Sequence, residues 1–461
     1  MSNQTATLSQ RIGAFVAGLS VETMPAEIAE KARVCLLNGY GIGLGSHSTP
    51  YSGVARRAAL GFDGERPDGA TLLGDGRKAA VAGAAVANSA LFHGRAQEDT
   101  CGAAHMGAIM IPLLTALLEA KRLPVERLVP ALVAGYEAGG LLEKAYSPIT
   151  TPRGLRSSPL YGTIAAAAAS ARLMGLDAAT TAVAIDCAAS FTGGILQSFS
   201  EGTDEWRYQV GLAGSTGLTA ALLAANGAVS APHSLEGRFG FVRAFAGSDC
   251  DVEELAGRLG QEWATRRVTF KPYPVCAFNQ TPVIAALALR EKAAGREFAR
   301  ISVRMNPLET GYAGMDSTGP FHTVSGTLMS IPFCIALTLV RGEPTLRAMT
   351  TYDDREVNAL ISRVELVPDE GVARLCCTID AELADGGRLG VEQVMTTENF
   401  NYDRAIVSRL VRRIGTEQDV PAKAYDLIED FAFGMLDKTV GPLGKGVDQV
   451  LAAFALCPRP A

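Results

Sequence analysis

The densest group of reactive side chains interrupts two apolar runs between Ala84 and Leu118. A buried charge needs a partner or a shifted pKa, so a chain seldom places many ionisable groups between two core helices unless they face a cleft. Histidines and carboxylates are also the usual acids and bases of proton transfer. We therefore take this polar segment as the first candidate site, with a solvated loop as the alternative. Its polar residues are His93, Arg95, Glu98, Asp99, Thr100 and His105.

Arginines occur ahead of two predicted small-residue helices. Arg153 and Arg156 precede a helix expected to begin near Thr163, and Arg207 and Gln209 lie in EWRYQVG, at the start of another. A cation at a helix N-terminus opposes the helix dipole, and a bound anion would remove that conflict. The sequence indicates anion binding at these places; the alternatives are solvated arginines and aromatic packing.

Two further residues could transfer protons. Lys271, in VTFKPYPVC, lies among prolines and aromatics, where a poorly hydrated lysine can act as a base. Tyr146 is expected where a helix ends before Pro148. Taken singly, a lysine more often extends its charge to the surface, and such a tyrosine hydroxyl more often faces water.

The composition excludes several classes of partner. The 461 residues carry 42 basic and 48 acidic side chains, mixed along the chain, for a formal net charge of −6, so no face for nucleic acid or anionic lipid is expected. None of the nine cysteines has metal-ligand spacing, and we predict no metal site. The N-terminal residues lack a signal pattern, and the apolar run after His105 is shorter than the roughly 20 residues that cross a bilayer. We expect a cytoplasmic protein with a small ligand.

The composition also changes along the chain, which predicts two domains. Residues 1–267 are rich in Ala, Gly and Leu at helical spacing, and this pattern returns in residues 397–461. Residues 268–396 contain shorter β-rich segments and two helical stretches. We therefore expect a mainly α protein with a large all-helical domain, discontinuous in sequence, and a smaller α+β domain.

One glycine pattern suggests a nucleotide site, but its context does not. Residues 74–79 match G-x-G-x-x-A, with Glu98 near the place of a ribose-binding acid. A dinucleotide fold alternates strands and helices around these glycines, whereas helical sequence flanks them here. We interpret the pattern as a turn before the helix Ala79–Phe92 and predict no cofactor.

Four motifs, in order, resemble those of the MmgE/PrpD family: MPAEIAEKARVCLLNGYG, ANSALFHGRAQEDTCGAAHMG, KPYPVCAFNQTP and LMSIPFCIALTL. The resemblance covers nearly the whole chain. It implies a discontinuous all-helical domain, a smaller lid-like α+β domain, an active site between them, a homodimer and no nucleotide cofactor. The family includes 2-methylcitrate dehydratase, cis-aconitate decarboxylase and iminodisuccinate epimerase.

Departures from the family pattern distinguish among these activities. Thr100 and His105 match the family, but Ala96 replaces the Asp that opens DFDDT, and KRxHxG becomes WRYQVG, without its Lys and His. The His of KPYPxCxxxHP is replaced in the stretch that begins at Asn279. Eliminating water requires both a base and an acid, and candidates for both are missing. A simpler proton transfer is more compatible with what remains.

We therefore predict an epimerase that transfers a proton at the α-carbon of a small polycarboxylate, similar to iminodisuccinate. The resemblance favours Tyr146 and Lys271 as a pair on opposite faces of that carbon. The alternatives are a dehydratase-type or decarboxylase-type lyase, and an inactive polycarboxylate-binding homologue. The predicted catalytic residues are Lys271, Tyr146 and His105, and the predicted substrate-binding residues are Thr100, Arg156, Arg207, Gln209 and Asp99.

A homodimer is also expected from the helical sequence. Ala165–Ala171 and Leu212–Ala225 offer more apolar face than one helical layer covers. The alternative is that both stretches lie inside one large monomeric core.

Overall fold

The computed structural model describes residues 6–435 and 446–458, so two parts of the predicted segment 397–461 lie outside the described residues. The α-helices are α1 (Leu8–Gly18), α2 (Ala26–Gly45), α3 (Pro50–Asp63), α4 (Val81–Phe92), α5 (Met106–Lys121), α6 (Leu128–Thr150), α7 (Ser157–Met174), α8 (Ala178–Phe191), α9 (Gln197–Glu201), α10 (Trp206–Ala225), α11 (Val252–Arg258), α12 (Gln280–Ala293), α13 (Pro307–Thr310), α14 (Val324–Met329), α15 (Ile331–Arg341), α16 (Arg355–Ile361), α17 (Arg404–Glu417), α18 (Ala422–Gly434) and α19 (Asp448–Ala455). The β-strands are β1 (Ala70–Thr71), β2 (Lys78–Ala79), β3 (Thr100–Cys101), β4 (Val268–Thr269), β5 (Phe298–Met305), β6 (Val364–Pro368), β7 (Cys377–Leu383) and β8 (Arg388–Gln393).

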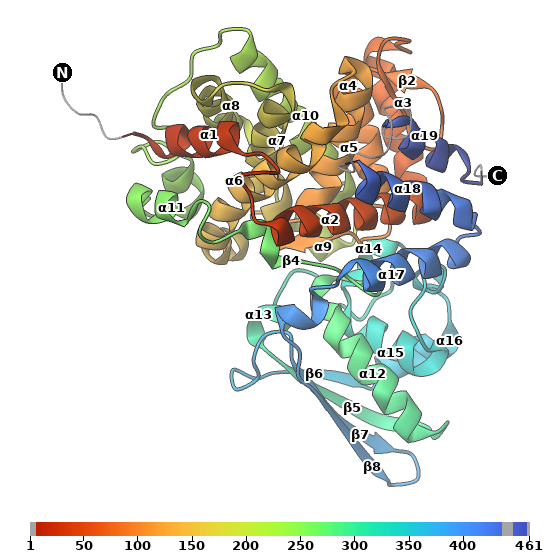
Figure 1. Cartoon of the computed structure of the whole chain (residues 1–461). Helices are drawn as coiled ribbons and strands as arrows, with labels where there is room; N and C mark the ends of the chain where they lie inside the picture. Colours follow the sequence, from red (N-terminus) through yellow and green to blue (C-terminus); the bar gives the residue numbers. More distant parts are fainter. Residues whose placement is uncertain (1–5, 436–445, 459–461) are drawn as a thin grey trace.

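The larger, helical part of the molecule is built from both ends of the sequence (Figure 1). Helices α17 and α18 return from the far end of the chain to pack against α2. Two glycines of α2 permit this approach, because a Cβ on Gly41 would overlap Val411 and one on Gly45 would overlap Ile414. One hydrophobic core therefore extends from α1 to α19.

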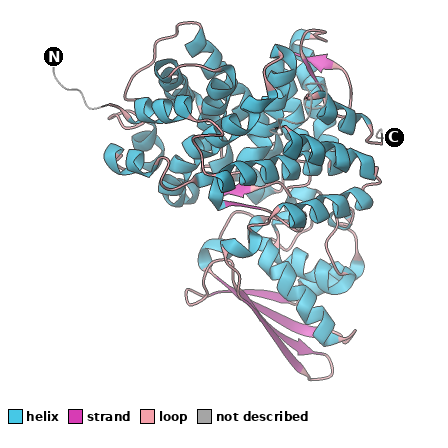
Figure 2. Ribbon diagram, viewed as in Figure 1, coloured by secondary structure: helices cyan, strands magenta, loops and turns pink. Residues whose placement is uncertain are grey.

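The smaller part is an α+β unit around a four-stranded sheet (Figure 2). The strand order is β6-β5-β7-β8, with β6 parallel to β5 and the other pairs antiparallel. Along β7, Cys377, Ile379 and Ala381 are buried and alternate with more exposed residues, as expected for a sheet with one covered face. Helices α12 and α15 pack against the sheet. The prediction of a mainly α protein with a smaller α+β part is confirmed.

The two parts meet along a short strand pair and a shared apolar cluster. Strand β3, which lies within the polar segment, pairs antiparallel with β4, so that Thr100 lies opposite Thr269. Lys271 follows β4 by two residues, and the pairing therefore brings it to the polar segment. The core of the smaller part also includes Phe199 and Trp206 from the helical part, so the junction is buried.

Two expected helix boundaries are wrong. Helix α6 continues through Pro148 to Thr150, because a proline in the last turn removes few backbone hydrogen bonds. Tyr146 therefore lies within a helix. Helix α7 begins at Ser157, with Arg156 as its N-cap, rather than near Thr163.

Three further predictions concern the surface and the glycine turn. The glycines at 74 and 76 lie in a β1–β2 hairpin before α4, which is not a dinucleotide-binding arrangement. Residues 165–171 are fully buried inside the subunit, whereas Leu212, Leu222 and Leu223 of α10 are exposed. Within the described ranges, no helix has both the length and the apolar character needed to cross a bilayer.

Candidate active site

The Glu98 carboxylate is the centre of a buried polar cluster at the junction of the two parts. Its Oε1 lies 2.9 Å from Lys271 Nζ and 2.9 Å from His105 Nδ1, and its Oε2 lies 3.1 Å from His93 Nδ1. Burial alone would raise the pKa of Glu98, but His93, Lys271 and His105 hold it well below its ordinary value. Glu98 is therefore an ionised carboxylate with three side-chain nitrogen atoms around it.

The contact between Arg156 and His93 identifies the protonated nitrogen of that histidine. Arg156 Nη2 lies 2.8 Å from His93 Nε2. A guanidinium can only donate, so Nε2 accepts and the imidazole proton is on Nδ1, which faces Glu98. Burial lowers the pKa of His93 to about 3, with Glu98 opposing and Arg156 reinforcing the shift. His93 is thus a neutral link from Arg156 to Glu98.

His105 is the histidine of the cluster that solvent reaches, with 19% of its side chain exposed. It is the N-cap of α5, and its backbone N–H donates to Ser158 Oγ at 3.1 Å. Burial, and then the Lys271 charge, lower the pKa of its imidazole. Because Nδ1 faces the Glu98 carboxylate, Nε2 is left as a proton acceptor, the arrangement of a general base oriented by a carboxylate.

Lys271 is held as a donor to the same carboxylate oxygen. Its Nζ donates to Glu98 Oε1 and to the backbone carbonyl of Ala96, which leaves one of its three N–H groups for another acceptor. Ala96 has φ 56°, an uncommon conformation for a residue other than glycine and one often found at functional sites.

Arg156 lies at the junction, within a group of aromatic rings. Its Nη1 donates to the Trp206 carbonyl at 2.5 Å and to Gln209 Oε1 at 3.1 Å. Its guanidinium carbon lies 5.3 Å from the Phe199 ring centre, and Tyr312 of the smaller part interacts with it electrostatically. Burial lowers the pKa of Arg156 to about 10, so it remains a cation at neutral pH.

Arg207 is fully buried beside this group and has a free edge. Its Nη1 donates to Asp204 Oδ1 at 2.8 Å and to Ser325 Oγ at 2.5 Å. The guanidinium carbon lies 3.8 Å from the ring centre of Tyr51 and 4.0 Å from that of Trp206. Nε and Nη2 have no partner among the described residues, and a guanidinium edge of this kind matches a carboxylate.

Three polar residues near the cluster have partners elsewhere. The Thr100 hydroxyl contacts that of Thr269 at 2.8 Å across the β3–β4 pair. Asp99 accepts from the Tyr136 hydroxyl inside the helical core, and burial raises its pKa to about 6. Arg95 pairs with Glu417 of α17 at 2.7 Å. The structure thus brings Lys271 and His105 together on Glu98, with Arg156 and Gln209 reaching it through His93.

Tyr146 is not brought to Lys271. It is buried in α6 against Cys250, and burial together with this contact raises its pKa. Tyr136, on the same helix, is the tyrosine that reaches the polar segment, and ten residues of helix separate the two tyrosines by about 15 Å. The expected Tyr146–Lys271 pair therefore has no structural support.

Glu98 and His93 were expected in the polar segment but not among the catalytic or binding residues, and Tyr312 was not expected at the site. For Glu98 a signal was present, because AQEDT matches DFDDT with a carboxylate at this position. For Tyr312 there was none, since its approach to Arg156 depends on how the two parts dock.

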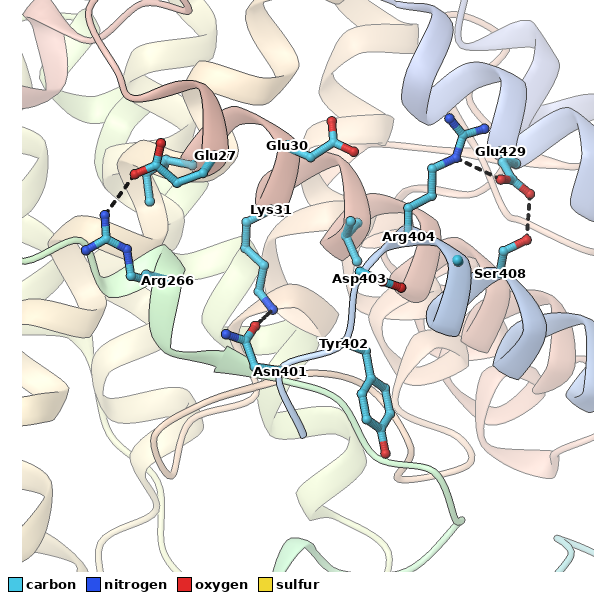
Figure 3. A pocket seen from close by; sticks show the side chains of 13 residues that line it. Glu27, Glu30, Lys31, Arg266, Asn401, Tyr402, Asp403, Arg404, Ser408 and Glu429 are labelled. Atoms are coloured by element: carbon cyan, nitrogen blue, oxygen red, sulfur yellow. Dashed lines mark hydrogen bonds and ion pairs between the residues drawn. The ribbon is translucent and has the colours of Figure 1, made fainter. Parts of the chain in front are cut away.

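A separate pocket of about 790 Å³ lies between α2 and the start of α17 (Figure 3). Its cations are already paired: Arg266 with Glu27 at 2.9 Å and Arg404 with Glu429 at 3.0 Å. Lys31 donates to Asn401. None of the predicted site residues lines this pocket, so it offers little to a polycarboxylate.

Comparison with known proteins agrees with this architecture. The sequence model of the MmgE/PrpD N-terminal domain matches residues 10–253, and that of the MmgE/PrpD C-terminal domain matches residues 273–406. The chain belongs to the MmgE/PrpD family. The resemblance stated from the motifs is thereby confirmed, and the two matches correspond to the helical part and the α+β part.

Two fungal relatives carry an enzyme activity in their names. A cis-aconitate decarboxylase-like protein, oryM, of Aspergillus oryzae is 28% identical over 77% of this chain and 78% of its own length. The cis-aconitate decarboxylase of Aspergillus terreus is 24% identical over 91% of this chain and 88% of its own length. These relatives support the lyase alternative, while the epimerase prediction has no support from them.

Proposed function

We propose that this chain is a lyase that decarboxylates a small polycarboxylate, with its site at the Glu98 cluster. The observation that carries the proposal is the sharing of one carboxylate oxygen by His105 and Lys271, each 2.9 Å away. One group is a neutral proton acceptor and the other a cationic proton donor. The names of the two fungal relatives favour decarboxylation among the reactions that such a pair can assist.

In this proposal the carbon–carbon bond to one carboxylate breaks and carbon dioxide leaves. The electron pair delocalises onto a neighbouring carboxylate, where the free edge of Arg207 and the Lys271 cation stabilise the negative charge. Lys271 then transfers its remaining free proton to carbon and regains a proton from water. His105 is neutral in this proposal. A protonated His105 would stabilise the leaving carboxylate before the bond breaks, and would therefore slow the reaction.

Epimerisation is the second candidate, because the same two groups can also exchange a proton at one carbon. His105 Nε2 would remove the α-proton and Lys271 would return one to the other face. This assignment replaces Tyr146 with His105 as the partner of Lys271. It requires the two groups to approach the substrate from opposite sides, which the shared oxygen alone does not guarantee.

Nuclear magnetic resonance of a polycarboxylate panel in D2O, including cis-aconitate, separates the candidates. A decarboxylase gives a product with one carbon fewer and one deuteron at the carbon that lost carbon dioxide. An epimerase incorporates deuterium at the α-carbon and retains the carbon skeleton. Binding without either change would indicate an inactive homologue and would contradict the proposal.

Lys271→Ala provides the residue-level test. It should reduce turnover by about a hundredfold or more. Lys144→Ala is the matched control, because Lys144 makes an exposed ion pair with Glu262 at 2.6 Å, which is worth little energy. Equal activity in the two variants would show that Lys271 does not act at the site.

A further inference from the structure

Ser325 of α14 contacts three groups of the helical part across the junction. Its hydroxyl oxygen accepts from Trp206 Nε1 at 3.0 Å and from Arg207 Nη1 at 2.5 Å, and it donates to Asp204 Oδ1 at 2.7 Å. The residue is completely buried. A hydroxyl has one proton and two lone pairs, so all its hydrogen-bonding capacity is used.

The contact continues from Trp206 into the Glu98 cluster. The Trp206 carbonyl accepts from Arg156 Nη1, and the Trp206 ring packs edge-on against the His93 ring with centres 4.5 Å apart. Arg156 Nη2 then donates to His93 Nε2. A continuous series of contacts therefore connects the smaller part to the histidine that faces Glu98.

We propose that Ser325 is a positioning residue that couples docking of the smaller part to the protonation of His93. When α14 is docked, Ser325 fixes Trp206 and thereby holds Arg156 against His93 Nε2. The neutral ring then keeps its proton on Nδ1, 3.1 Å from Glu98 Oε2, and the other carboxylate oxygen is left to His105 and Lys271. The catalytic arrangement would thus be complete only in the docked state.

The charged and titratable groups around His93 determine the direction of the expected change. Glu98 favours its protonation, whereas Arg156 and His105 oppose it. Arg156 itself faces Tyr312 and Arg207. Loss of the Ser325 hydroxyl frees Trp206 and weakens the Arg156 contact, so the pKa of His93 should rise and the ring should bind a second proton at higher pH.

Thr323 provides a matched control on the same segment. Its hydroxyl also crosses the junction, donating to the Gly202 carbonyl, and it caps α14. Its hydroxyl makes no hydrogen bond to Trp206 or Arg207 among the described residues. Thr323→Ala therefore removes an interdomain hydrogen bond of the same kind without touching the proposed route.

The test is the ¹⁵N spectrum of histidine-labelled protein from pH 7 to pH 5, which is practicable because the chain has five histidines. His93→Gln assigns the signal. In the wild type and in Thr323→Ala, His93 should stay neutral with its proton on Nδ1. In Ser325→Ala it should become mixed or protonated above pH 5. An unchanged His93 signal in folded Ser325→Ala protein would overturn the proposal.

The effect of Ser325→Ala on turnover rests on the proposed function, whereas its effect on the ¹⁵N signal of His93 does not. If the chain is active, Ser325→Ala should lower kcat at least tenfold more than Thr323→Ala. A Ser325→Ala/Trp206→Phe variant should then lose no more kcat than the worse of the two single variants, rather than the product of the two single losses, since both substitutions act through one contact. A shifted His93 signal in a chain that turns over no polycarboxylate would contradict the proposed function alone.

Discussion

Glu98 and Asp99 are adjacent carboxylates with opposite environments. Glu98 faces Lys271, His105 and His93 and has a lowered pKa. Asp99 points into the helical core, where burial raises its pKa to about 6 despite the Tyr136 hydroxyl that donates to it. The difference shows that the pKa of a carboxylate at this junction depends on the groups that surround it, and not on the acidic sequence itself.

Glu98→Gln should reduce turnover far more than the corresponding change at Asp99. The amide retains the shape of the side chain but leaves Lys271 buried without a counter-charge and His105 without its orienting carboxylate. We expect turnover to fall by about 10²- to 10³-fold, measured as kcat on the substrate found by the panel. Loss of a buried ion-pair partner can also destabilise the fold by about 3–5 kcal/mol, so thermal unfolding is measured in parallel. Asp99→Asn should stay within a few-fold of the wild type, and a comparable loss there would remove the contrast.

Arg207→Lys should have the next largest effect. Lysine keeps the positive charge but lacks the planar edge formed by Nε and Nη2, so KM should rise about tenfold with a smaller change in kcat. Steady-state kinetics over a range of substrate concentrations measures both. Unchanged KM would mean that the free edge of Arg207 does not bind a substrate carboxylate.

Asp99→Asn should change stability in a pH-dependent way. Because the pKa of folded Asp99 is above its unfolded value of 3.8, its contribution to stability is fully present below pH 3.8 and is lost as the pH rises through about 6. The asparagine variant should therefore gain stability relative to the wild type between pH 4 and pH 7, by at most about 3 kcal/mol. Urea unfolding at several pH values tests this, and a constant difference would contradict it.

Tyr146→Phe should have the smallest effect on catalysis. The Tyr146 hydroxyl meets Cys250 and not the Glu98 cluster, so kcat and KM should stay within about twofold of the wild type. A large loss in kcat with an unchanged unfolding temperature would show that Tyr146 takes part in catalysis.

The sequence allowed prediction of the fold and of part of the site. The change in composition located the α+β segment, and the KPYP motif pointed to Lys271. The meeting of Lys271 with Glu98 depends on the pairing of β3 with β4, two short strands almost 170 residues apart, and no local pattern encodes it. Tyr146 was assigned to the site from segment order alone. In the structure it lies further along α6 and contacts Cys250.

The most direct test of the Glu98 cluster is the pH dependence of kcat/KM for the wild type, corrected for ionisation of the substrate. In the proposed reaction His105 works as a neutral imidazole, and burial and Lys271 hold its pKa below the ordinary 6.5. Activity should therefore be constant through neutral pH and should fall only below pH 6.5, as His105 becomes protonated. An acid limb with its midpoint at or above pH 6.5 would contradict this account of the site.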